Sequence, residues 1–141
     1  MTTESVFNVT IPTTIDWGII KDLIKEYRLD DNNLSIDQFI IVKNEQTLLG
    51  FGRLKKHLDC DEVSSLGVLP QNRNKGVGKI IIEELVKQAA KNIYIVTIIP
   101  DYFVKLGFEK TCQFPASMMT KQNDCKDVCG CDSPTVMMLK K

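Results

Sequence analysis

The sequence lacks both a long apolar run and an excess of one charge. Its 141 residues carry 18 Lys plus Arg and 18 Asp plus Glu, so no overall field attracts nucleic acid or an anionic membrane surface. The longest apolar stretches, such as residues 93–100, fall far short of the ~20 residues of a membrane span. Residues 1–5 lack the basic-then-apolar pattern of a secretory signal. We therefore expect a cytoplasmic protein with neither nucleic acid nor membrane as a partner.

Cysteines are present in an odd number, five, and three of them crowd the last seventeen residues. This is a poor disulfide framework and indicates reduced thiols. Cys125, Cys129 and Cys131, in an expected loop over residues 121–134, also admit a zinc site completed by Cys112, Asp124 or Asp132. Because the paired C-x-x-C elements of common zinc sites are missing, free thiols are favoured and no metal is expected.

The length suits one compact domain, residues 1–141, and 43% hydrophobic residues suffice for a core. Hydrophobic periodicity predicts strands at residues 6–11, 38–42, 47–58, 62–69, 93–99, 108–112 and 135–139, and helices from residue 13 to 27, 76 to 91 and 101 to 106. Thr13 followed by Asp16 predicts the first helix start, and Gly107 the end of the third helix. Gly50 and Gly52 indicate a bend or bulge. The order β-α-β-β-β-α-β-α-β-β predicts an α/β fold with a mixed sheet of six to seven strands flanked by helices.

The most informative segment is residues 66–79, where a strand ends at Pro70 and a basic loop leads into a helix. Backbone N–H groups at a helix start lack intrahelical partners and form an anion site. Gly76 and Gly78 let that backbone approach a phosphate, and Arg73, Lys75 and Lys79 add positive charge. The pattern indicates a ligand that bears phosphate, or alternatively a tight turn with a solvated basic rim.

Two familiar phosphate loops do not fit this segment. A Walker loop requires Ser or Thr after Gly-Lys, but Ile80 follows Gly78-Lys79. The dinucleotide fingerprint G-x-G-x-x-G requires a third glycine where Ile81 stands. Both are excluded.

The segment instead resembles the coenzyme loop of the GCN5-related acetyltransferase (GNAT) family, Arg/Gln-x-x-Gly-x-Gly/Ala. Residues 73–78, Arg-Asn-Lys-Gly-Val-Gly, match every defined position. Residues 66–70 resemble the strand end L-x-V-x-P of the family, and residues 102–108 resemble its FYEKLGF segment. The resemblance covers roughly residues 5 to 112, and three blocks in the right order make it specific.

The resemblance implies a fold in which the strands at residues 62–69 and 93–99 are parallel neighbours that splay apart around the pantetheine arm of acetyl-CoA, the acetyl donor. By this resemblance the backbone of Leu66 and Val68 pairs with the arm, and the amides of residues 73–79 hold the pyrophosphate. The implied coenzyme residues are Leu66, Gly67, Val68, Arg73, Asn74, Lys75, Gly76, Val77, Gly78, Lys79, Phe103 and Lys105. An amine then attacks the thioester directly, through an oxyanion that a backbone N–H can stabilise.

The attacking amine must lose a proton, and Glu62 is the candidate base. It lies four residues before Leu66, where many family members carry a glutamate that acts through water. Strict alternation would place Glu62, Ser64, Leu66 and Val68 on one strand face, unless a bulge intervenes. An orienting or structural role for Glu62 is the alternative. His57, the single histidine, has a suitable pKa range for a base, but a lone histidine is more often structural.

The thiolate acid of the family is usually the tyrosine of the FYEKLGF segment. In this sequence Tyr102 occupies the phenylalanine position and Phe103 the tyrosine position. Neighbouring helical positions differ by about 100 degrees, so Tyr102 does not simply replace the usual acid. Tyr102 remains a candidate catalytic acid, with ordinary packing or a coenzyme contact as the alternative.

The acceptor is the least determined part. Residues 62–68, E-V-S-S-L-G-V, resemble a form common among members that act on amino acids, which favours a small-molecule amine. Acetylation of a protein or peptide and a non-catalytic acyl-CoA sensor are the alternatives. In this fold the acceptor pocket is built from the first helix region, the loop at residues 32–38 and the late hairpin, where no motif occurs. A homodimer is common in the family.

Overall fold

The computed structural model describes residues 7–73, 75–111, 113, 115–118 and 135–140. They form two compact units. The first unit comprises residues up to 54 together with 64–88, and the second comprises residues 55–63 together with those from 89 onward. The expected cysteine-bearing loop at residues 121–134, like Cys112, lies outside the described residues.

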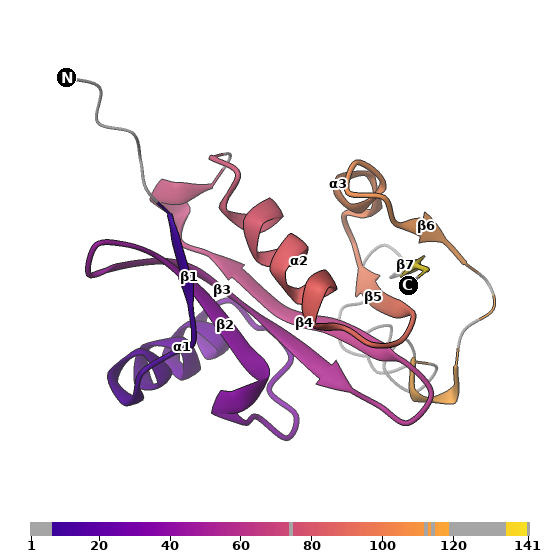
Figure 1. Cartoon of the computed structure of the whole chain (residues 1–141), viewed down its shortest axis with the longest axis horizontal. Coiled ribbons are helices and arrows are strands. Elements are labelled where there is room, and N and C mark those ends of the chain that lie inside the picture. Colours follow the sequence, from indigo (N-terminus) through magenta and orange to yellow (C-terminus); the bar gives the residue numbers. More distant parts are fainter. Residues whose placement is uncertain (1–6, 74, 112, 114, 119–134, 141) are drawn as a thin grey trace. The chain divides into compact units, whose positions relative to one another are not determined.

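The observed element order confirms the sequence prediction of an α/β fold with a mixed sheet (Figure 1). In the described part of the chain, the helices α1 (Thr14–Glu26), α2 (Val77–Gln88) and α3 (Pro100–Val104) are interspersed among the strands β1 (Asn8–Thr10), β2 (Phe39–Asn44), β3 (Thr47–Lys56), β4 (Asp61–Val68), β5 (Ile93–Thr97), β6 (Glu109–Lys110) and β7 (Thr135–Leu139). Among the described residues the sheet has seven strands in the order β1-β2-β3-β4-β5-β7-β6.

Pairing is antiparallel at both ends of the sheet. β2 pairs antiparallel with β1 and with β3, and β7 pairs antiparallel with β5 and with β6. The parallel pair is β4 with β5, whose register joins Asp61 to Ile93 and Glu62 to Tyr94. Glu62, the candidate base, therefore lies where β4 pairs with β5, at the start of β4.

Helix α1 begins as predicted. The Thr13 hydroxyl accepts from the Asp16 amide, and the Asp16 carboxylate accepts from the Thr13 amide, so the capping box is complete. Burial raises the pKa of Asp16, but hydrogen bonds from Thr13 and Lys43, together with the Lys43 charge, outweigh it and lower this pKa. Lys43 of β2 lies 3.0 Å from the carboxylate. The helix is thereby tied to the sheet at its first turn.

The core of the first unit is built from α1, β2 and β3. Ile20, Ile24, Phe39, Ile41, Leu48 and Phe51 are buried together, and Trp17, Leu23, Leu29, Leu34 and Leu69 pack against them. Phe39 stacks at tilted angles with both Trp17 and Phe51. This cluster supports the strand β3 from which Arg53 projects.

The glycines of β3 permit α2 to lie close against the sheet. A Cβ on Gly52 would stand 2.4 Å from Ile81 of α2, and one on Gly50 would stand 3.0 Å from Val77 of the same helix. The sequence predicted a bend or bulge at these glycines, and the register of β2 with β3 does shift between Val42 and Lys43. Their main role in the packing is this close approach of α2.

The second unit has its own apolar cluster of Cys60, Tyr94, Met118 and Val136, with Val96 and Met138 packed against it. Helix α3 ends before Gly107, whose φ of 98° confirms the predicted stop. Strand β7 has the predicted bounds, whereas β6 is shorter than predicted: Glu109 and Lys110 pair with β7, and just past them the Thr111 amide donates to the Val136 carbonyl.

Candidate active site

The loop that carries the coenzyme motif lies in the first unit, between β4 and α2. After Val68 the chain makes a 3-10 turn, Pro70–Asn72, and α2 begins at Val77. Gly76 has φ 83°, a left-handed conformation that disfavours other residues. Its carbonyl accepts from the Ile80 amide, so Gly76 closes the first turn of the helix. The amides that follow are those that an α-helix leaves without intrahelical acceptors, which makes this end suitable for a phosphate.

The basic side chains of this loop differ in their surroundings. Arg73 Nε donates to the Val68 carbonyl at 2.9 Å, and its guanidinium lies 5.5 Å from the centroid of the Tyr27 ring. Lys75 and Lys79 are exposed, and Lys79 pairs with Glu83 at 3.9 Å, one turn along α2. Arg73 therefore braces the end of β4, while the two lysines project into solvent. Asn74 lies outside the described residues.

Strand β4 does not alternate strictly. Ser65 has φ 48°, and all five residues from Asp61 to Ser65 are buried. A left-handed residue interrupts the two-residue period, so Glu62 and Leu66 do not share one face through simple alternation. Of the two arrangements that the sequence left open, strict alternation and an interrupted strand, the positive φ of Ser65 agrees with the interrupted one.

A buried polar cluster holds the irregular part of β4 to the loop after α1. Asp30 receives hydrogen bonds from Ser64 to its carboxylate at 2.9 Å and from Ser65 to its carbonyl at 2.6 Å. Arg53, fully buried, donates to Gln38 and to the carbonyls of Asn32 and Asn33. We call these residues the Arg53 cluster: Asp30, Asn32, Asn33, Gln38, Arg53, Ser64 and Ser65. It fixes the chain from residue 30 to residue 38, which includes the loop at residues 32–38 that is expected to contribute to the acceptor pocket.

Glu62 lies in the second unit and is 1% exposed. Its Oε1 lies 2.9 Å from Nε2 of His57, whose side chain is 22% exposed. The sequence raised Glu62 and His57 as separate candidates for the base. The structure brings them into direct contact.

The neighbours of this pair are themselves buried and polar. The Asp61 carboxylate accepts from the amides of Ala90 and Lys91, which fixes the chain between α2 and β5. Burial raises the pKa of the Cys60 thiol to about 12, with the Asp59 charge adding to the effect. Burial likewise raises the pKa of Tyr94. Cys60 is therefore a protonated packing residue and not a nucleophile.

Helix α3 presents the two swapped aromatic residues differently. Phe103 is 3% exposed and packs edge-on against Phe108, with centroids 5.8 Å apart. Tyr102 is 37% exposed, and burial of its remainder raises its pKa. Lys105 is exposed just past the end of the helix. The Tyr102 phenol thus remains in the protonated form that an acid requires, whereas the Phe103 side chain is buried in the core.

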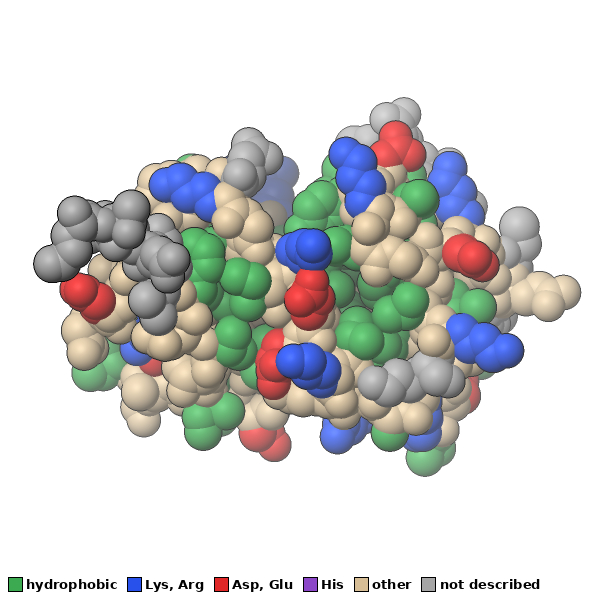
Figure 2. Space-filling view, turned by 45° about the horizontal axis from the view of Figure 1, so that its top comes forward, with side chains coloured by type: hydrophobic (Ala, Val, Ile, Leu, Met, Phe, Trp, Pro, Cys, Tyr) green, Lys and Arg blue, Asp and Glu red, His purple; other side chains and the backbone are tan. Residues whose placement is uncertain are grey.

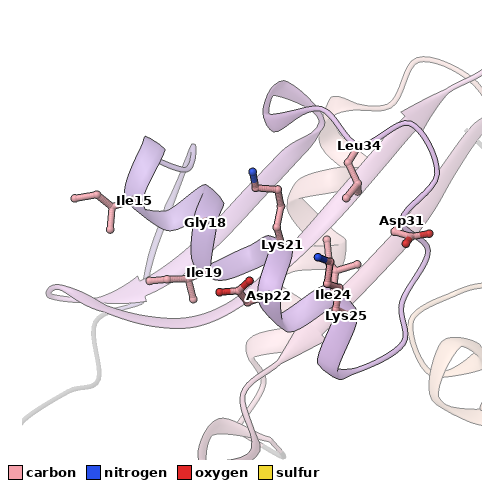
Figure 3. Close-up of a pocket in the computed structure, with 9 residues that line it drawn as sticks. All are labelled: Ile15, Gly18, Ile19, Lys21, Asp22, Ile24, Lys25, Asp31 and Leu34. Carbon is pink, nitrogen blue, oxygen red and sulfur yellow. The ribbon is translucent and has the colours of Figure 1, made fainter.

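A pocket of about 570 Å³ lies along α1 in the first unit (Figure 3). Its walls are formed by α1 and the loop after it: Ile15, Gly18, Ile19, Lys21, Asp22, Ile24, Lys25, Asp31 and Leu34. These are two of the segments expected to surround the acceptor, but the pocket contains none of the candidate coenzyme residues. The pocket by itself therefore indicates neither a ligand nor a reaction.

Figure 2 shows one face of the molecule on which basic and acidic side chains are interspersed among apolar ones, as the balanced composition leads one to expect. Within the described part of the chain no helix is long and apolar enough to cross a membrane. The same residues contain no group of three or more His, Cys, Asp or Glu side chains suited to a metal ion. The expected free thiols of Cys125, Cys129 and Cys131 fall outside that part.

Comparison with known proteins identifies the family. The family described as Acetyltransferase (GNAT) domain matches residues 35–110, more than half of the chain. This protein therefore belongs to the GNAT acetyltransferase family, as the three sequence blocks predicted. An N-acetyltransferase of Chlorobaculum tepidum, itself uncharacterized, is 26% identical over 77 residues, which are 50% of each chain. The chain thus matches about half the length of that curated relative.

Solved structures share the fold. N-acetylglutamate synthase from Neisseria gonorrhoeae, in complex with coenzyme A and N-acetyl-glutamate, superposes with a TM-score of 0.79 at 17% identity, over 98% of this chain and 36% of that one. A Mycobacterium tuberculosis protein in complex with CoA gives 0.75 at 18% identity, over 95% and 99% of the two chains. At these identities the likeness shows a common fold.

Sequence reasoning missed the Arg53 cluster and the contact between His57 and Glu62. No local motif marks Arg53, because arginine is a residue type that is mostly exposed. The five-residue spacing of His57 and Glu62, across the short gap between two predicted strands, was the available signal for their contact.

Proposed function

We propose that this chain transfers the acetyl group of acetyl-CoA to the primary amine of a small molecule, in a ternary complex. The observation that carries the proposal is the segment at residues 66–79, which combines the family motif with Gly76 at φ 83° directly before the start of α2 at Val77. The donors available there suit a pyrophosphate, because they are backbone amides flanked by exposed Lys75 and Lys79.

An amino acid is the acceptor class that we favour. The support is that a protein of the same fold was solved with coenzyme A and N-acetyl-glutamate, together with the resemblance of residues 62–68 to members that act on amino acids. Glu62 is the proposed base, since it is a buried carboxylate on the strand that leads to the coenzyme loop. Tyr102 is the proposed thiolate acid, because its side chain is partly exposed and its phenol stays protonated.

The test is a thiol-release assay with acetyl-CoA and a panel of L-glutamate, other amino acids, polyamines and N-terminal peptides. We expect turnover with amino acids, and a fall of about 10²- to 10⁴-fold in kcat/KM for Glu62→Gln, the usual range for loss of a general base. Tyr102→Phe tests the acid separately and should lower kcat without changing KM for acetyl-CoA. The exposed variant Leu58→Gln is the matched control, because Leu58 is 98% exposed on the same hairpin.

Other outcomes would redirect the assignment. Turnover confined to peptides would replace the small-molecule acceptor with a protein one. Acetyl-CoA binding without turnover on any amine, with binding abolished by Gly76→Val, would indicate a sensor.

A further inference from the structure

We propose that His57 is a proton-relay residue that carries the proton from buried Glu62 to solvent. This inference rests on the proposed function, and in particular on Glu62 as the base. It concerns a step that the family motif leaves open, namely where the proton goes after the base has taken it.

The chemistry requires an exit for one proton. Transfer of an acetyl group from acetyl-CoA to an ammonium form of an amine yields an amide, the CoA thiol and one proton released to water. If the Glu62 carboxylate takes that proton, it must lose it again before the next turnover. Glu62 is 1% exposed, so direct transfer to bulk water is hindered.

The geometry supplies a partner of the right kind. His57 Nε2 lies 2.9 Å from Glu62 Oε1, within hydrogen-bond distance, and the imidazole is 22% exposed. An imidazole can accept a proton at one ring nitrogen and release one from the other. The neutral carboxyl of Glu62 thus gives its proton to Nε2, which forms a carboxylate and an imidazolium, and the imidazolium then releases a proton to water. Glu62 is again a carboxylate and His57 a neutral imidazole with its proton on Nε2, and proton exchange between the ring and water returns that proton to Nδ1 before the next turnover.

Both backbone polar groups of His57 are hydrogen-bonded. Its amide donates to the Cys60 carbonyl at 2.9 Å across the hairpin turn. Its carbonyl accepts from the Lys91 ammonium at 2.8 Å. Both contacts involve the backbone of His57, and neither uses a ring nitrogen.

Two substitutions separate relay from positioning. His57→Gln retains an amide that can donate to Glu62 but cannot pass a proton on, whereas His57→Leu removes both properties. We expect kcat with the best amino-acid acceptor to fall about 10-fold in either variant, with KM for acetyl-CoA unchanged, because the loss falls on proton transfer. Added imidazole at millimolar concentration should restore most of kcat in His57→Gln, since a small base can replace the missing relay. Leu58→Gln on the same turn should show neither the loss nor the rescue.

The double variant His57→Gln with Glu62→Gln completes the test. If His57 acts through Glu62, the double variant is no slower than Glu62→Gln alone, because the two act as one unit. A His57→Gln enzyme with normal kcat, or with a deficit that imidazole leaves unchanged, would overturn the relay while a slow Glu62→Gln enzyme keeps the proposed base. Absence of turnover with every amine would overturn the proposed function and the relay together.

Discussion

Arg53 of the first unit and Glu62 of the second are both buried charged side chains, and they are held in opposite ways. Arg53 is fully buried, donates to an amide side chain and two backbone carbonyls, and lies 3.9 Å from the Asp30 carboxylate. Glu62 is 1% exposed and contacts an imidazole that itself reaches solvent. These acceptors of Arg53 are fixed groups, and the ring beside Glu62 can carry protons. A buried charge of the first kind serves structure, and one of the second kind can change its protonation during turnover.

The largest effect on stability should follow from removing the buried charge of Arg53. Arg53→Met keeps much of the side-chain volume but leaves the Asn32 and Asn33 carbonyls and Gln38 without their donor. We expect a loss of about 3–5 kcal/mol in the free energy of unfolding, the usual cost of breaking a buried polar arrangement. Urea denaturation followed by circular dichroism measures it, with Arg53→Lys as the matched variant that keeps the charge. A loss below about 1 kcal/mol would contradict the structural role of the Arg53 cluster.

A smaller effect with a clear pH dependence is expected at Asp16. Its pKa is lowered in the folded chain, so its charge stabilises the fold above its unfolded pKa of about 3.9, and this contribution is lost as the pH falls through the folded value. Asp16→Asn should therefore be less stable than the wild type by about 1 kcal/mol at neutral pH, the typical value of a helix cap. The difference, measured by urea denaturation across the pH range, should vanish in strong acid. A difference that persists unchanged at low pH would show that the charge has no part in it.

A substitution of Ser65 tests one hydrogen bond of the Arg53 cluster, the bond from the Ser65 hydroxyl to the Asp30 carbonyl. Ser65→Ala removes the hydrogen bond to the Asp30 carbonyl but keeps a residue that must adopt φ 48°. We expect a loss of about 1 kcal/mol, measured by urea denaturation. Ser117→Ala, which removes an exposed bond from a serine hydroxyl to Asp59, is the control and should cost less. Equal losses would mean that burial adds nothing to the bond from Ser65.

What the sequence predicted and what it missed differ in how far apart the interacting residues lie along the chain. The helix start at Thr13, the stop at Gly107 and the bounds of β7 are recorded in short windows, where capping residues and alternation act locally. The loop motif at residues 73–78 was recognisable because two glycines at fixed positions are a local signal. The bond from Ser64 to Asp30 joins residues 34 apart along the chain, and no local pattern records such a pairing. The sequence analysis allowed for a bulge in this strand, but it could not assign a left-handed conformation to Ser65, because serine carries no signal for positive φ.

Glu62→Gln is expected to have the smallest effect on stability and a large effect on catalysis. Glu62→Gln preserves the shape of the side chain and an oxygen that can face His57, and it removes a buried charge whose desolvation is costly. We therefore expect the free energy of unfolding to change by less than about 1 kcal/mol, while kcat/KM falls by the factor of about 10² or more proposed for a general base. Urea denaturation and thiol release on the same preparation measure the two quantities. A loss of stability as large as that of Arg53→Met would show that Glu62, like Arg53, is needed for the fold, and would contradict the distinction drawn between the two buried charges. A stable variant with normal turnover would instead remove Glu62 from the chemistry, and the role of base would pass to another group of the second unit.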